Sequence, residues 1–524
     1  MRRALRFGRA AVAVVLVPVV LASFVATSCS SNLEVTVQRA DAVTVPTPSP
    51  TTLPEPVTTD PVESTDPAGP GPVAAPETSP PPGDSPDGVG DALYPSLGNP
   101  GIDVRDYDIA LTYDPTGDTI AGSVTLTLAA TADRAEFTLD AVDLTIDAVR
   151  VDGADAAFVV EPEELRITPV SPLVSGRSAT VVVEYHGAPD AGAGLGLLSG
   201  WFHTETGSYV LNEPDGARTW LPSNDHPSDK ATFTFRLTVP AGITAVANGA
   251  LASSVPSPDG GTTWTWRENE PMATYLVQLL TGDYEVIEGE SSSGVPLLSV
   301  VLRSDVESVQ PCIDSIGDQI DFLVDLFGPY PLDRYGIAVT DSFGGLAMET
   351  QGRSLFSRED LVPCTLAPIQ ELLLSHELAH QWFGNAVTPA QWQDIWLNES
   401  FATYAQWLWL AEADVESVDS AAGTALSLRA QFGGNATGLP SADELFGYNS
   451  YDGGAVVLHA LRLTVGDEVF FTILNRWAAE NNGASRTTAD FIALAESESG
   501  LDLGDFFATW LYSRVIPTEF PAPQ

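Results

Sequence analysis

The stretch that most constrains this chain runs from Leu372 to Phe401 and reads LLLSHELAHQWFGNAVTPAQWQDIWLNESF. His376 and His380 stand four residues apart, so on a helix their imidazoles lie on one face, one above the other. Apolar residues recur here at three- and four-residue intervals, Pro368 suits a first helical turn, and Gly384 supplies a stop. We therefore expect a buried helix that carries both histidines and ends near Gly384.

Two imidazoles leave a tetrahedral zinc ion short of a ligand, because a catalytic zinc site uses three protein ligands and an open position. Glu399 would complete the set from a second helix, which we expect to run from Glu399 to about Glu412. Glu377 lies beside the first histidine, where a carboxylate can act as general base next to the metal. The pattern predicts one zinc ion per chain, held by His376, His380 and Glu399.

Acidic residues dominate the charge of the chain. Asp and Glu number 70 against 23 Lys and Arg, and the formal net charge is −47. A chain with this charge lacks the basic surface that binds a phosphate backbone, so we expect no nucleic acid partner. Hydrophobic residues make up 44% of 524 residues, which is enough for two or three globular domains.

The N-terminal residues 1–29 predict export. Early arginines are followed by an apolar run from Ala10 to Leu21 and by VATSC, Val25 to Cys29, a pattern typical of a signal peptide. Cys29 after small residues resembles the lipobox of bacterial lipoproteins, in which the cysteine is lipidated. We expect a lipoprotein anchored to the membrane at the cell surface; the alternatives are an anchor helix or secretion after cleavage near Ser28.

Beyond Cys29 the chain has only two cysteines, Cys312 and Cys364. An exported protein can form disulfides, so a bond between them is allowed. The sequence leaves their pairing open. Neither cysteine is expected to bind metal, because no CxxC spacing is present.

The rest of the chain divides into three parts. Residues 30–91 are rich in Pro, Thr, Ser and Asp and bury too little surface to fold, so we expect a disordered tether. Residues 92–290 show short alternating runs between Gly, Asp and Pro turns, which predict an antiparallel β domain. Residues 291–524 read as α+β, with a helix predicted from Val306 to Phe327 ahead of the two zinc-site helices.

Several phrases, in order, are similar to the aminopeptidase N family of zinc metallopeptidases, which also holds the leukotriene hydrolases. They span Tyr94 to Pro517 and include EPDGAR, PSDKATFTF, FGPYPLDRY, LAMET, HELAHQWFGN, WLNESFATY and YDGGAVVLHALR. The resemblance implies a multidomain fold, in which an N-terminal antiparallel β domain is followed by a thermolysin-like α+β, mainly helical catalytic domain. It also implies a short form without the family's C-terminal helical domain, and hence a more open cleft.

The resemblance assigns substrate-binding residues. The family phrase usually written GAMEN is a β-edge that holds the substrate peptide, and its glutamate binds the free α-amine of the substrate. LAMET matches this phrase at Ala347, Met348 and Glu349, and departs from it at Leu346 and Thr350. Glu349 is thus the implied amine ligand.

A second amine ligand of the family stands five residues before an arginine, as Glu213 stands before Arg218. Two carboxylates suit one buried ammonium, since a buried cation needs paired negative charge. Taken alone, the surrounding segment from Asn212 to Phe235 reads as a turn-rich edge loop.

Two further positions are matched by the resemblance. Tyr451 in YDGGA corresponds to the family's catalytic tyrosine, whose phenol donates to the oxyanion; the alternative is that Tyr451 only packs. Gln406 stands seven residues beyond Glu399, where the family usually has a glutamate, so an amide would support the metal site here.

The implied activity is that of a zinc aminopeptidase acting on peptides with a free N-terminus. Zinc would polarise the scissile carbonyl and lower the pKa of its water, Glu377 would move the proton, and Tyr451 would stabilise the oxyanion. Two rival hypotheses remain: a zinc endopeptidase, which needs no paired amine-binding acids, and a catalytically silent surface lipoprotein that keeps the fold.

Overall fold

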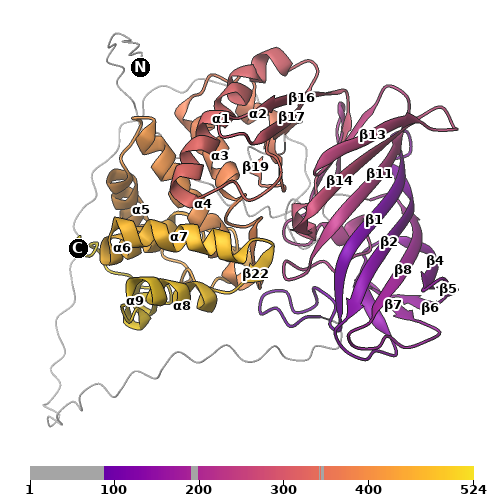
Figure 1. The fold of residues 1–524 in the computed structure, drawn as a ribbon, viewed down its shortest axis with the longest axis horizontal. Helices are drawn as coiled ribbons and strands as arrows, with labels where there is room; N and C mark the ends of the chain where they lie inside the picture. The colour runs from indigo at the N-terminus through magenta and orange to yellow at the C-terminus, as the bar shows by residue number, and fades with distance from the viewer. Residues whose placement is uncertain (1–87, 190–198, 342, 344–346, 524) are drawn as a thin grey trace, which may run out of the picture. The chain divides into compact units, whose positions relative to one another are not determined.

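The computed structural model describes residues 88–189, 199–341, 343 and 347–523 (Figure 1). The predicted signal segment with Cys29, the tether up to residue 87, and Leu346 lie outside the described residues. Among the described helices, none has the length and hydropathy needed to cross a membrane.

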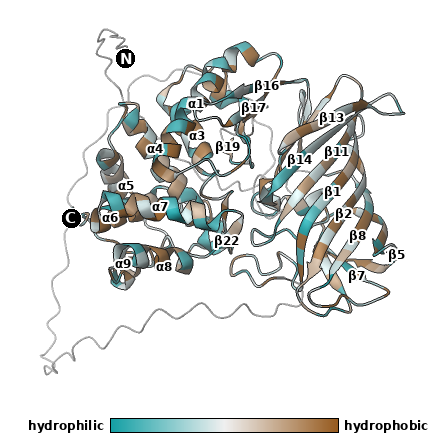
Figure 2. Cartoon of the chain, in the orientation of Figure 1, coloured by the Kyte–Doolittle hydropathy of each residue, from teal (hydrophilic) through white to brown (hydrophobic). Residues whose placement is uncertain are grey.

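The first domain is built on an eight-stranded sheet (Figure 1). In spatial order its strands are β13 (Ala250–Pro256), β14 (Thr262–Ala273), β11 (Lys230–Val239), β1 (Ile102–Asp114), β2 (Thr119–Ala130), β8 (Ser178–Gly187), β4 (Thr145–Val151) and β5 (Ala154–Asp155). Buried and more exposed side chains largely alternate along β1, and Figure 2 shows the matching change of hydropathy along the strands. This period of two is what places one face of the sheet on the core.

The large sheet is antiparallel, as expected, except at one pair of strands. β1 and β11 run parallel, with Tyr107 opposite Phe233, whereas the other paired strands of this sheet are antiparallel. Hairpins force antiparallel neighbours, but β1 and β11 are separated by more than a hundred residues, so a crossover can bring β11 in along either direction.

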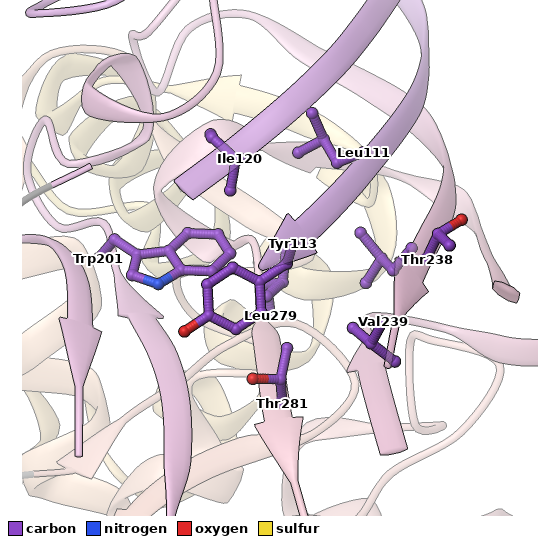
Figure 3. Close-up of a pocket in the computed structure, with 9 residues that line it drawn as sticks. Leu111, Tyr113, Ile120, Trp201, Thr238, Val239, Leu279 and Thr281 are labelled. Atoms are coloured by element: carbon purple, nitrogen blue, oxygen red, sulfur yellow. The ribbon is translucent and has the colours of Figure 1, made fainter. Parts of the chain in front are cut away.

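Two smaller sheets complete the β domain. One has the order β12 (Thr244–Ala247), β15 (Leu279–Gly282), β10 (Gly207–Leu211) and β9 (Gly200–His203). The other has the order β3 (Phe137–Asp140), β7 (Glu164–Thr168) and β6 (Ala157–Val160). A small cavity between the four-stranded and eight-stranded sheets is lined mainly by apolar side chains, and the rings of Tyr113 and Trp201 lie 5.3 Å apart beside it (Figure 3).

Most of the segment from Asn212 to Pro227 is buried, so it is not the edge loop that the segment taken alone suggested. The guanidinium of Arg218 is 1% exposed and donates to the carboxylate of Asp215 at 2.6 Å. The backbone N–H of Arg218 donates to Asp225 at 2.9 Å. Because these charges pair with one another, the loop can be buried between the two domains. Its end continues as β11, inside the large sheet.

The second domain contains a five-stranded sheet with the order β16 (Tyr284–Glu290), β17 (Pro296–Leu302), β18 (Ile337–Thr340), β20 (Ser354–Ser357) and β19 (Ala347–Met348). The expected boundary at 290 is displaced, because β16 pairs with β17 along its whole length and so belongs to this sheet. β17, β18 and β20 are parallel, while β19 is a two-residue antiparallel strand at the edge.

Helices form the larger part of the second domain. They are α1 (Val306–Phe327), α2 (Arg358–Leu361), α3 (Pro368–Ala379), α4 (Trp396–Glu412), α5 (Val418–Phe432), α6 (Asp452–Val465), α7 (Asp467–Asn481), α8 (Thr488–Ser499) and α9 (Gly504–Trp510). The predicted bounds of α1 are confirmed. α3 ends at Ala379, earlier than expected, because Gln381 N–H bonds the carbonyl of Leu378 and tightens the last turn.

Cys312 and Cys364 form a disulfide, which settles the pairing that the sequence left open. The bond joins α1 to the segment that leads into α3. It closes a loop of 52 residues, so it constrains how the segment ahead of α3 is held against α1.

Candidate active site

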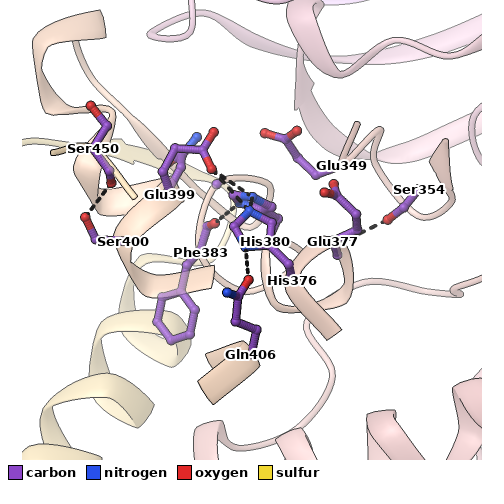
Figure 4. Close-up of polar contacts among 12 residues, drawn as sticks. Glu349, Ser354, His376, Glu377, His380, Phe383, Glu399, Ser400, Gln406 and Ser450 are labelled. Atoms are coloured by element: carbon purple, nitrogen blue, oxygen red, sulfur yellow. Dashed lines mark hydrogen bonds and ion pairs between the residues drawn. The ribbon is translucent and has the colours of Figure 1, made fainter. Parts of the chain in front are cut away.

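The three predicted metal ligands come together between α3 and α4 (Figure 4). His376 Nε2 and His380 Nε2 lie 3.3 Å and 3.4 Å from Glu399 Oε2. The two Nε2 atoms are 3.1 Å apart. All three side chains are buried. The two histidines come from the C-terminal end of α3 and the glutamate comes from α4, so two helices form the cluster.

The other ring nitrogen of each histidine has its own partner. His376 Nδ1 lies 2.9 Å from Gln406 Oε1 on α4, and His380 Nδ1 lies 3.1 Å from the carbonyl of Phe383. Both partners accept hydrogen bonds, so each Nδ1 carries a proton and each Nε2 is the atom directed at the other ligands. The expected supporting amide at Gln406 is therefore in contact with the metal site.

This donor set fits a zinc ion. Bonds of about 2.0–2.1 Å to a tetrahedral zinc place neighbouring ligand atoms about 3.3 Å apart, and the three distances here are 3.1, 3.3 and 3.4 Å. Two imidazole nitrogens and one carboxylate oxygen form a known catalytic zinc set. The geometry thus allows one zinc ion without rearrangement of the ligands.

Burial and neighbouring charges shift the acid–base properties of the site. Burial lowers the pKa of the His376 imidazole, which favours the neutral form that binds metal. Burial opposes the charge on His380, yet the facing carboxylates of Glu349 and Glu399 raise the pKa of this imidazole to about 10, so a bound metal would displace its proton. Burial also opposes the charge on Glu399, but His380 lowers the pKa of this carboxyl to about 2. The cluster therefore offers a neutral imidazole and an ionised carboxylate to a cation.

Glu377 lies beside the ligands on α3 and is 6% exposed. One of its carboxylate oxygens lies within 4.8 Å of ligand atoms of both His380 and Glu349. Burial, with a further contribution from Glu349, raises its pKa well above the usual range. Figure 4 shows the carboxylates of Glu349, Glu377 and Glu399 around the imidazoles. A base in this position can reach a water near the metal site.

Glu213 and Glu349 meet although they belong to different domains. Carboxylate oxygens of Glu213, Glu349 and Glu399 all lie within 4.8 Å of one another. Oε1 of Glu213 and Oε1 of Glu349 are buried without a hydrogen-bond partner. Burial and the facing Glu349 raise the pKa of Glu213 well above its usual range. Ala347 lies on β19, two residues before Glu349, at the open edge of the five-stranded sheet. Two unpaired carboxylate oxygens beside a strand edge form a site for a cationic group of an extended chain.

Tyr451 stands at the N-cap of α6 and faces the metal ligands. Its ring stacks on His376 with centroids 6.0 Å apart. Burial and the neighbouring carboxylates raise the pKa of its phenol well above 10, so the hydroxyl stays protonated and can donate a hydrogen bond. Gly454 allows the close packing behind it, because a Cβ there would lie 1.7 Å from Ser400 Oγ.

Sequence reasoning missed three residues that surround this site. Gln381 and Asn385 follow the second histidine, are fully buried, and contact the backbone of Glu349. Lys230, the first residue of β11, donates to the carbonyls of Asn385 and Ala386. The sequence signal for Gln381 and Asn385 was a pair of amide side chains in HQWFGN, close to the apolar residues Trp382 and Phe383.

Comparison with known proteins supports one family for both domains. Residues 104–276 match the model of the Peptidase M1 N-terminal domain, and residues 312–510 match the Peptidase family M1 domain. Aminopeptidase M1-C of Oryza sativa subsp. japonica is 26% identical over 459 residues, with 82% of this chain and 51% of that protein covered. The chain spans about half the length of the curated relatives it matches.

Solved structures from Deinococcus radiodurans share both domains. The M1 zinc metallopeptidase of that organism is 32% identical, with a TM-score of 0.76, and the match covers 83% of this chain and 98% of that one. A mutant of that enzyme, solved with a Tyr-Ser-Ala substrate bound, is also 32% identical, with a TM-score of 0.75 and coverage of 83% and 99%.

Proposed function

Because the chain belongs to the M1 family of zinc metallopeptidases, we propose that it is a zinc-dependent aminopeptidase that removes residues from the free N-terminus of peptides. The observation that carries this proposal is the placement of Glu213 and Glu349 next to the predicted metal ligands. An α-ammonium between these two carboxylates would pair both unpartnered oxygens and place the first peptide bond beside His376 and His380.

The residues of the chain divide the chemistry among them. A zinc ion held by His376, His380 and Glu399 would act as a Lewis acid on the scissile carbonyl and lower the pKa of a nearby water. Glu377 would accept the proton of that water and deliver it to the leaving amine. The protonated phenol of Tyr451 would donate a hydrogen bond to the oxygen on which negative charge develops.

One assay separates this function from its rivals. A peptide with a free N-terminus and its N-acetylated form are incubated with the protein, with and without a chelator. An aminopeptidase cleaves the free peptide far faster than the acetylated one and stops when the metal is removed. An endopeptidase cleaves both forms, and a silent peptidase-fold lipoprotein cleaves neither.

We also propose a stoichiometry of one zinc ion per chain. The support is the single cluster of two histidines and a glutamate at tetrahedral spacing among the described residues. Metal analysis of the purified protein should give one zinc per chain, and His380→Ala should abolish it. Wild-type stoichiometry in His380→Ala would exclude this site.

For its location we propose an exported lipoprotein anchored through Cys29, with the cell surface as its site of action. The support is the apolar N-terminal run followed by VATSC. Mass spectrometry of the mature protein should find an acylated cysteine at its N-terminus. An unmodified terminus at another residue would exclude the lipid anchor and leave a secreted or helix-anchored protein.

A further inference from the structure

Glu349 directly follows β19, an edge strand that makes few hydrogen bonds with its sheet. β19 has two residues and pairs with β20 only through Ala347 and Met348. The position of Glu349 must therefore be set by contacts outside the strand ladder, since so short a pairing restrains the next residue weakly.

Two amides in the segment directly after α3 supply those contacts. Asn385 Nδ2 donates to the backbone carbonyl of Glu349 at 2.6 Å, and Gln381 Nε2 donates to the same carbonyl at 3.2 Å. Gln381 Oε1 accepts from the backbone N–H of Gly352 at 2.9 Å and from Asn385 Nδ2 at 3.1 Å. Gln381 thus contacts the backbone on both sides of the turn after Glu349, while it follows the metal ligand His380 directly in sequence.

The same network reaches the β domain. Lys230 Nζ donates to the carbonyl of Asn385 at 2.6 Å and to that of Ala386 at 3.1 Å. Lys230 begins β11, the strand that follows the buried loop carrying Glu213. Hydrogen bonds therefore connect Lys230, the first residue of β11, to the carbonyl of Asn385, and the side chain of Asn385 to the backbone of Glu349.

We propose that Gln381, Asn385 and Lys230 are positioning residues that fix the separation between the two amine-binding carboxylates and the metal ligands. This inference rests on the proposed aminopeptidase function. The three residues do not touch the substrate. They hold the backbone of Glu349 and the β domain against the segment that follows α3. A bound ammonium then places the first peptide bond at the metal site.

The physical reason is the sensitivity of catalysis to placement. A displacement of about 1 Å at a reacting bond costs roughly 10²-fold in rate. Buried amide hydrogen bonds are short and directional, and the loss of either donor leaves the buried carbonyl of Glu349 with one partner in place of two. The chain would then shift to find another donor, and Glu349 would move with it.

The test uses the full-length, zinc-loaded protein and compares kcat/KM for Leu-Ala-Ala with that for N-acetyl-Leu-Ala-Ala. This ratio does not depend on the fraction of active protein. In Asn385→Leu and Gln381→Met the ratio should fall at least tenfold, with zinc content unchanged and with the loss mainly in kcat. Gln319→Met is the matched control. Gln319 on α1 is also buried, and its amide donates at 3.1 Å to Glu371 in the first turn of α3, away from Glu349. The control should keep the wild-type ratio.

A second pair of variants covers the case in which an amide variant does not fold. Lys230→Met should lower the ratio several-fold, and Lys230→Arg, which keeps a donor, should restore most of it. Zinc-loaded variants that keep the wild-type ratio overturn the inference and leave the proposed function intact. A wild-type protein that shows no preference for the free peptide overturns the proposed function, and the inference with it.

Discussion

The catalytic role of Glu377 can be tested with a substitution that keeps the structure of the site. Glu377→Gln keeps the size of the side chain and the neighbouring ligands, but an amide cannot accept the proton of a water. Turnover should fall by roughly 10²–10⁴-fold, the usual contribution of a general base. Zinc content, measured by metal analysis, should stay at the wild-type level. Activity within a factor of ten of wild type would assign the base to another group.

Replacing Glu349 should reduce activity more than replacing Glu213. Glu349 is almost fully buried, whereas Glu213 is half-buried. Glu349→Ala should lower kcat/KM on free peptides by roughly 10²–10³-fold, because loss of one partner of a buried charge pair costs roughly 3–5 kcal/mol. Glu213→Ala should cost roughly tenfold, since the more exposed Glu213 is lost while the more buried Glu349 remains. Steady-state kinetics with metal content as the control tests both, and equal losses would contradict the ranking.

At the level of elements, the disulfide between α1 and the segment ahead of α3 should stabilise the catalytic domain. Replacing both Cys312 and Cys364 by alanine should lower the free energy of unfolding by about 2–4 kcal/mol, because a long loop is released in the unfolded chain. Chemical denaturation under oxidising conditions measures this change. The reduced wild-type protein should match the double variant, and a double variant as stable as the oxidised wild type would refute the expectation.

At the level of the whole molecule, the net charge of −47 should influence which peptides reach the site. The predicted site adds four carboxylates of its own, Glu213, Glu349, Glu377 and Glu399. A strongly negative field attracts cationic substrates and is screened by salt, over a Debye length of about 30 Å at 0.01 M and about 3 Å at 1 M. The ratio of kcat/KM for Leu-Arg-Arg to that for Leu-Glu-Glu should therefore exceed one and fall as salt rises. A ratio independent of salt would show that only local contacts select the peptide.

The sequence by itself determined those features that depend on local spacing. Four residues between His376 and His380 place two imidazoles on one helix face, and apolar periodicity predicted α1 to its end residues. Alternation of polar and apolar residues was sufficient to predict a β domain followed by a mainly helical one. These features are set by backbone periodicity within one segment, so a linear reading can find them.

Only the tertiary structure decided the contacts between distant segments. It made β1 and β11 parallel neighbours, buried the loop that holds Glu213, and paired Cys312 with Cys364. It also joined Lys230, Asn385 and Glu349 through hydrogen bonds across the two domains. Such contacts depend on how whole elements pack, and a buried amide or lysine has the same local sequence pattern whether its partner is near or far. Their energy comes from burial of paired polar groups, which exists only after the chain has folded.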